Sequence, residues 1–205
     1  MAGEISSTAR APRGRGPRAE ARVRAIFRSL HDCMIRKGYV KTTLADIAEG
    51  AGMSASHLLY YFGGKDDILE QYFARVAVRF LRRLEEISQQ APRAQVDLLA
   101  EWWFGETSGS RDEIGFMLEC FGTAVHDEVL RVTKADFDAR CKAYLRALFE
   151  RCERRDGAAA EDLAEIAYAL MIGLRSAVYF DEDVPLERAR ELFRATLRRL
   201  CGFTA

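Results

Sequence analysis

Large apolar residues recur at helical spacing along most of the chain. The first such stripe, from about Glu20 to Lys37, places them at i, i+3, i+4, i+7 and i+11, as Val23, Ile26, Phe27, Leu30 and Met34. Almost no alternating stretch is long enough for a strand, and prolines occur only at positions 12, 17, 92 and 185. The pattern therefore predicts an all-α protein.

The same spacing predicts the helices that follow residue 65. A loop is expected at FGETSGS, residues 104–110, because glycine and small polar residues cluster there. Pro92 and Pro185 mark helix starts. The expected helices run from about Asp66 to Ser88, from Pro92 to the loop, over about 112–125, about 128–155 and about 161–181, and from Pro185 to about 201.

Two short helices joined by a glycine turn are predicted between residues 43 and 62. Thr43 and Asp46 have the spacing of a capping box variant, which would begin the first of them. Gly52 suits a left-handed turn, and Ser54 can cap a helix that runs to about Phe62. This is the arrangement of a helix-turn-helix, although an ordinary helical hairpin has the same pattern.

Charge is distributed unevenly, although the 31 basic and 31 acidic side chains give a net charge of zero. Residues 1–65 contain 11 Lys and Arg against 5 Asp and Glu, so the rest of the chain is acidic by the same amount. Residues 1–18 are rich in Gly, Pro, Ser and Arg and are expected to form a disordered basic arm. The arm is either a solvated tail or a segment that touches DNA.

Composition excludes several classes of protein. The chain is 49% hydrophobic, which suffices for a core, but it has no uninterrupted apolar run of about 18 residues, the length that spans a membrane. The first 20 residues lack the apolar run of a signal peptide, so a cytoplasmic protein without a membrane partner is expected. Five scattered cysteines without C-x-x-C spacing indicate reduced thiols, although a thiol-based redox sensor stays an alternative.

The segment from residue 38 to residue 69, GYVKTTLADIAEGAGMSASHLLYYFGGKDDIL, resembles the DNA-binding domain of the TetR family of bacterial transcriptional regulators. The resemblance rests on the glycine and the threonine pair before the second helix, the Ile-Ala within it, the Ala-Gly turn, the serine cap, the aromatic pair ending in Phe, and the later lysine. It implies three parts: the arm at 1–18, a three-helix helix-turn-helix domain at 19–65, and a larger helical domain for effector binding and dimerisation at 66–205.

The resemblance also implies which residues contact DNA. Carried over to this chain, they are Thr43, Ser54, Ala55, Ser56, His57, Tyr60, Tyr61 and Lys65. Hydroxyls, helix N-terminal amides and an ammonium suit phosphate contacts. His57 either contacts DNA or only covers the helix, whereas Tyr60 and Tyr61 have core packing as their alternative. Leu59 departs from the family, in which tyrosine is frequent, so a phosphate contact is lost or replaced by an apolar contact with thymine.

The acidic domain is expected to hold a small-molecule effector among aromatic and polar side chains. The candidates are Trp103, Phe116, Met117, Glu119, Phe121, His126, Tyr144, Arg175 and Tyr179. Each polar candidate is, as an alternative, a surface or satisfied core residue. Trp102 and Trp103 are adjacent and cannot share one helix face, so at most one of them would line a pocket.

Two apolar stripes near the C-terminus resemble the family's dimerisation helices, in which two pairs form a four-helix bundle. A purely intramolecular core is the alternative. The candidate interface residues are Leu163, Ile166, Leu170, Leu174, Val178, Leu192, Phe193, Leu197 and Leu200.

The function that the resemblance implies is that of a homodimeric repressor. It would bind a palindromic double-stranded DNA operator and be released by a small-molecule effector. We expect no enzyme, cofactor or metal site, because the three histidines lie in separate elements and no phosphate-binding glycine loop or nucleophile elbow is present. A helical small-molecule-binding protein that does not read DNA is the remaining alternative.

Overall fold

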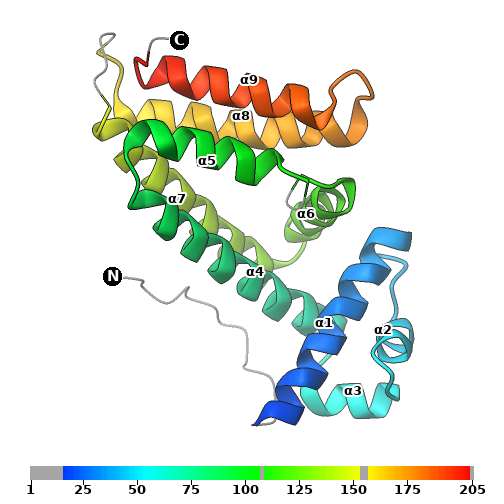
Figure 1. The fold of residues 1–205 in the computed structure, drawn as a ribbon. Helices are drawn as coiled ribbons and strands as arrows, with labels where there is room; N and C mark the ends of the chain where they lie inside the picture. The colour runs from blue at the N-terminus through cyan, green and yellow to red at the C-terminus, as the bar shows by residue number, and fades with distance from the viewer. Residues whose placement is uncertain (1–15, 107–108, 153–156, 204–205) are drawn as a thin grey trace. The chain divides into compact units, whose positions relative to one another are not determined.

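A computed structural model describes residues 16–106, 109–152 and 157–203 of the chain (Figure 1). This part contains helices and no strands, which confirms the all-α prediction. The helices are α1 (Pro17–Lys37), α2 (Leu44–Gly50), α3 (Ala55–Tyr61), α4 (Lys65–Ser88), α5 (Pro92–Phe104), α6 (Arg111–Ala124), α7 (Glu128–Glu150), α8 (Ala160–Phe180) and α9 (Leu186–Leu200).

Helix boundaries differ from the sequence predictions at three places. α1 begins at Pro17 rather than Glu20, because proline is favoured in a first turn, whose N–H groups have no helical partner. α7 ends at Glu150 rather than near 155, since Arg151 and Cys152 bond to carbonyls three residues back and close a tight last turn. Pro185 has extended geometry and precedes α9 instead of opening it. Most of the predicted arm, residues 1–15, lies outside the described residues.

The chain forms two compact units. The first comprises Met1–Val78 and Phe116–Asp136, and the second comprises Arg79–Gly115 and Phe137–Ala205. Three helices, α4, α6 and α7, therefore contribute residues to each unit. The first unit has its own core, in which Ile26, Leu30, Ile47 and Leu58 are completely buried.

The second unit is built around buried aromatic side chains. Trp103 and Phe104 of α5 pack against Phe193 of α9, with ring centroids 5.2 and 5.4 Å from that of Phe193. All three are at most 1% exposed. α9 lies alongside both α5 and α8 (Figure 1).

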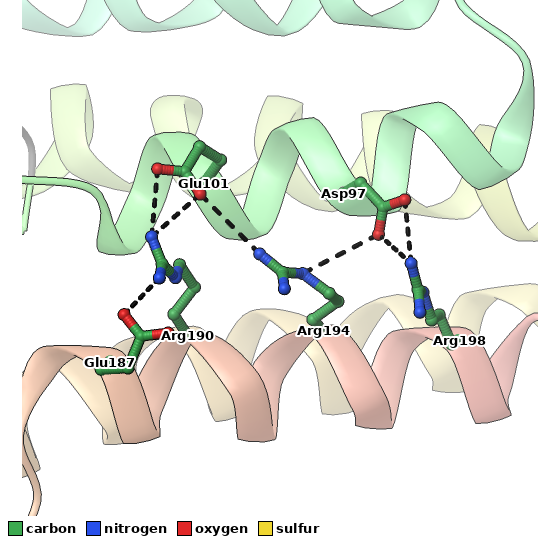
Figure 2. A network of polar contacts seen from close by, with 6 residues as sticks. All are labelled: Asp97, Glu101, Glu187, Arg190, Arg194 and Arg198. Atoms are coloured by element: carbon green, nitrogen blue, oxygen red, sulfur yellow. Dashed lines mark hydrogen bonds and ion pairs between the residues drawn. The ribbon is translucent and has the colours of Figure 1, made fainter. Parts of the chain in front are cut away.

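Figure 2 shows the ladder of ion pairs that links α5 to α9. Its members are Asp97, Glu101, Glu187, Arg190, Arg194 and Arg198. Arg194 lies between the two carboxylates of α5, 3.8 Å from Asp97 and 3.7 Å from Glu101. Arg198 continues the ladder at 2.7 Å from Asp97. Single exposed ion pairs stabilise little, but carboxylates shared between successive arginines favour one register of α9 along α5.

The apolar surface of α8 extends beyond the part that is buried in the core. Leu163, Ala167 and Met171 are buried against the second unit's core, whereas Ile166, one turn after Leu163, is 52% exposed. By length and composition alone α8 would also suffice to cross a membrane, but a core helix of a soluble protein passes the same test. An apolar outer side instead suits contact with another protein surface.

Candidate nucleic-acid interface

α2 begins with the capping box that the sequence predicts. The Thr43 hydroxyl accepts a hydrogen bond from the Asp46 amide at 3.2 Å, and the Asp46 carboxylate accepts one from the Thr43 amide at 2.7 Å. Lys37 lies 2.6 Å from the same carboxylate and, with the Thr43 hydrogen bonds, holds the pKa of Asp46 well below its usual range. The reciprocal bonds satisfy amides at the helix start that have no helical partner.

The turn between α2 and α3 is also confirmed. Gly52 has a φ of 65°, in the left-handed region that favours glycine, and the Met53 amide bonds back to the Ala48 carbonyl at 2.9 Å. The Ser54 hydroxyl then accepts from the His57 amide at 3.2 Å and caps α3. Leu58 is fully buried and anchors α3, so the other side of this helix is presented to solvent.

Most of the predicted DNA contacts lie together on the exposed side of α3 and the start of α2. The exposed members are Thr43, Ser54, Ala55, Ser56, His57 and Tyr60. Tyr60 is 56% exposed, which disfavours core packing as its role, and Leu59 beside it is 46% exposed. Tyr61 is half-buried, packs against the core and has its ring centroid 5.5 Å from that of His57. The surface thus offers hydroxyls and helix N-terminal amides together, which is a chemistry that suits phosphate.

Lys65, the remaining predicted contact, is held by a residue that the sequence did not single out. Its ammonium donates to the Tyr39 carbonyl at 3.0 Å and lies 4.1 Å from the centroid of the Tyr39 ring. Tyr39 is only 7% exposed. Burial and a hydrogen bond from its hydroxyl to Asp66 raise the pKa of Tyr39. In the sequence, only the position of Tyr39 directly after Gly38, at the start of the segment that resembles the family, could have pointed to this residue.

The predicted effector residues are divided between the two units. Phe116, Met117, Glu119, Phe121 and His126 belong to the first unit, and Trp103, Tyr144, Arg175 and Tyr179 belong to the second. In the first unit, Phe116 stacks on His31 with ring centroids 4.8 Å apart. The Lys134 ammonium lies 4.2 Å from the centroid of the Phe121 ring. His126 is exposed. Glu119 accepts a hydrogen bond from the Tyr39 amide at 2.9 Å. Phe116 and Glu119 thus each contact another residue of the first unit.

In the second unit, Arg175 closes the end of a helix. It is 7% exposed, and its guanidinium donates to the Trp103 carbonyl at 2.8 Å, in the last turn of α5. A cation there satisfies a carbonyl without a helical partner. Burial lowers the pKa of Arg175 to about 10, against the opposing influence of Glu113. Of the other candidates, the Tyr144 hydroxyl donates to Gln95 at 2.8 Å, and the Arg111 guanidinium lies 4.9 Å from the Tyr179 ring centroid.

The predicted dimer residues fall into two groups. Leu163, Phe193 and Leu197 are buried in the second unit's own core. The others keep part of their surface accessible in the single chain: Ile166, Leu170, Leu174, Val178, Leu192 and Leu200. The first group therefore fits the intramolecular interpretation, and only the second is available to a partner.

Four of the five cysteines are buried and therefore poorly accessible to oxidants. Cys33, Cys120, Cys141 and Cys201 are at most 1% exposed, and only Cys152 is half-buried. Burial, followed by the nearby charge of Glu119, raises the pKa of Cys120. Because the thiolate is the form that reacts with oxidants, this burial argues against a thiol-based sensor at the four buried positions.

The raised pKa of Glu70, on α4, should make the stability of the folded chain depend on pH. Burial, and then the negative charges of Asp127, Asp67 and Asp66, raise the pKa of Glu70 from 4.5 to about 7. Between these values the folded chain keeps a proton that the unfolded chain releases, so stability falls as the pH rises through this window. We expect Glu70→Gln to raise the thermal midpoint at pH 8 and to flatten the decline from pH 5. Scanning calorimetry from pH 5 to 8 measures the thermal midpoint of each protein. Glu85→Gln, at an exposed position, is the control and should follow the parent. If the midpoint of Glu70→Gln declined in parallel with that of the parent, Glu70 would not be the group responsible.

Comparison with known proteins agrees with this architecture. Residues 26–72 match the family model for bacterial regulatory proteins of the tetR family, and residues 92–202 match the model for the C-terminal part of BetI-type transcriptional repressors. HTH-type transcriptional regulator BetI 2 of Chromohalobacter salexigens is 29% identical over 118 residues, which are 56% of this chain and 57% of the relative. BetI 1 of the same organism is 27% identical over 160 residues, 76% of this chain and 78% of the relative. The match thus spans little more than half the length of the first relative.

Solved structures share the fold. A transcriptional regulator from Saccharomonospora viridis, in complex with choline, has a TM-score of 0.78 at 23% identity over 88% of this chain and 96% of its own. SmeT, the repressor of the Stenotrophomonas maltophilia multidrug efflux pump SmeDEF, has a TM-score of 0.71 at 21% identity over 86% and 88%. Two family models in chain order, together spanning the helix-turn-helix and the C-terminal helices, show that the chain belongs to the TetR family of bacterial transcriptional regulators.

Proposed function

We propose that this regulator is a homodimeric repressor that binds a palindromic operator in the cytoplasm and is released by a small organic effector. The observation that carries the proposal is the exposed side of α3, where Ser54, Ser56, His57 and Tyr60 surround a capped helix start. A helix of this kind reads the major groove with its N-terminal residues. Two copies related by a two-fold axis would place two such helices on successive half-sites, roughly 34–36 Å apart.

The distribution of charge along the chain also supports DNA binding. Residues 1–65 carry the chain's excess of basic side chains, and the acidic excess lies in the remainder. Phosphate attracts the first segment and repels the second, which would orient the protein on DNA. The proposed division into arm, helix-turn-helix domain and effector domain follows this change of charge.

Salt-dependent binding to the DNA upstream of the protein's own gene tests the proposal. We expect affinity to fall steeply as salt rises, because Lys and Arg neutralise phosphate charges. Tyr60→Phe removes one neutral hydroxyl, so it should weaken binding at every salt concentration and leave the slope unchanged. Fluorescence anisotropy at several salt concentrations measures the slope. Val125→Ala, at a position 69% exposed on the first unit, is the control and should leave both the affinity and the slope unchanged. If the protein bound no genomic fragment in a salt-dependent manner, a helical binding protein that does not read DNA would be the better interpretation.

Choline is the first effector to test. A structurally similar regulator was solved with choline, and the C-terminal segment matches the BetI-type model. Aromatic side chains attract quaternary ammonium groups, and this chain has several in its candidate set. If choline binds the protein by calorimetry but leaves the operator affinity unchanged, ligand-dependent release fails for this compound.

A further inference from the structure

Tyr39, in the turn between α1 and α2, contacts both α4 and α6 within the first unit. Its amide donates to Glu119 of α6, and its hydroxyl donates to Asp66 of α4. Its carbonyl and its ring face the Lys65 ammonium. One buried side chain and its backbone thus join α6 to the first residues of α4.

Lys65 is fixed by two different interactions with Tyr39. The hydrogen bond of 3.0 Å to the Tyr39 carbonyl uses one of the three ammonium donors, and the ring lies 4.1 Å away. The other donors remain available for a phosphate oxygen. Because a lysine side chain is long and flexible, holding it before DNA arrives lowers the entropy cost of the contact.

Glu119 in turn fixes the backbone that holds Lys65. The Tyr39 amide lies 2.9 Å from one Glu119 oxygen, and a Cβ placed on Gly38 would lie 3.3 Å from the other. The carboxylate therefore lies directly against the Gly38–Tyr39 backbone, where Gly38 has a left-handed φ of 79°. A shorter side chain at position 119 would withdraw the acceptor from the Tyr39 amide.

We propose that Tyr39 is a positioning residue for Lys65 and that Glu119 holds Tyr39 in place, so that α6 controls one phosphate contact of the regulator. This inference rests on the proposed DNA binding and adds to it the residues through which α6 acts. α6 runs from the second unit into the first, and its first-unit residues include Phe116, which packs on His31 of α1, as well as Glu119. Withdrawal of Glu119 releases the Tyr39 amide and frees Lys65 without any change in α3.

Paired substitutions at position 119 separate geometry from charge. Glu119→Gln keeps the length of the side chain and an acceptor oxygen but removes the charge. Glu119→Asp keeps the charge, but its shorter side chain cannot extend to the Tyr39 amide. We expect Glu119→Gln to bind operator DNA like the parent, and Glu119→Asp to bind several-fold more weakly with a salt slope reduced by about one. Glu128→Gln removes an exposed carboxylate of the same unit and controls for the change in net charge.

A double-mutant cycle with Lys65→Met completes the test. We expect Lys65→Met to reduce the salt slope by about one and Glu119→Asp to add no further loss in the Lys65→Met background. Circular dichroism checks that each variant is folded. Should Glu119→Asp not fold, Tyr39→Leu replaces it in the cycle with the same expected result.

The outcomes distinguish this inference from the proposed function. If the parent binds DNA and the two losses are additive, or if Glu119→Gln behaves like Glu119→Asp, Glu119 does not act through Lys65 and the inference is overturned. If the parent shows no salt-dependent DNA binding at all, the proposed function fails first, and this inference fails with it.

Discussion

Phe193→Ala is expected to destabilise the second unit by about 3–5 kcal/mol, the usual cost of removing a buried phenylalanine ring. Phe193 is completely buried, and its ring contacts those of Trp103 and Phe104. The cavity would lie between α5 and α9, which the charged ladder already holds in one register, so the surrounding helices have little freedom to collapse into it.

Urea unfolding followed by tryptophan fluorescence measures this loss. The chain has two tryptophans, Trp102 and Trp103, and both belong to the second unit, so their fluorescence reports on it. Phe180→Ala is the matched control, because Phe180 is 72% exposed and its removal should change stability by no more than about 0.5 kcal/mol. A loss below about 1 kcal/mol for Phe193→Ala would mean that the core at this point repacks.

Ile166→Glu is expected to convert the proposed dimer to a monomer and thereby remove most of its operator affinity. Ile166 is 52% exposed in the single chain, so a charge there costs the fold little. In a dimer that covers the outer side of α8, the same carboxylate would be buried without a partner. An uncompensated buried charge costs about 3–5 kcal/mol, which is more than 100-fold in the dimer dissociation constant.

Sedimentation equilibrium and operator binding together check this prediction. Val132→Glu introduces the same charge at a site on α7 that is 48% exposed, and it should leave both measurements unchanged. A variant at position 166 that stays dimeric would exclude the outer side of α8 from the interface. In that case the intramolecular interpretation of the C-terminal helices would be the better one.

Much of the candidate DNA interface could be predicted from the sequence, because it depends on short-range chemistry. The Thr43–Asp46 capping box, the left-handed turn at Gly52 and the Ser54 cap each involve residues close together in the sequence, and each occurs as expected. The helical character of the chain follows from apolar spacing in the same way. Only the helix ends at Pro17, Glu150 and Pro185 differed, where local turn geometry overrides the periodic pattern.

The sequence by itself thus determined the all-α fold, the helix-turn-helix and most of the side chains that α3 presents. Only the tertiary structure decided which distant residues meet: Glu119 with Tyr39, 80 residues away, and Arg175 with Trp103, 72 residues away. It also separated Phe116 from Trp103 into different units, although both belong to one aromatic set by composition. The reason is physical: periodicity gives the side of a helix that is buried, but the neighbour it meets depends on how packed helices rotate and slide against one another.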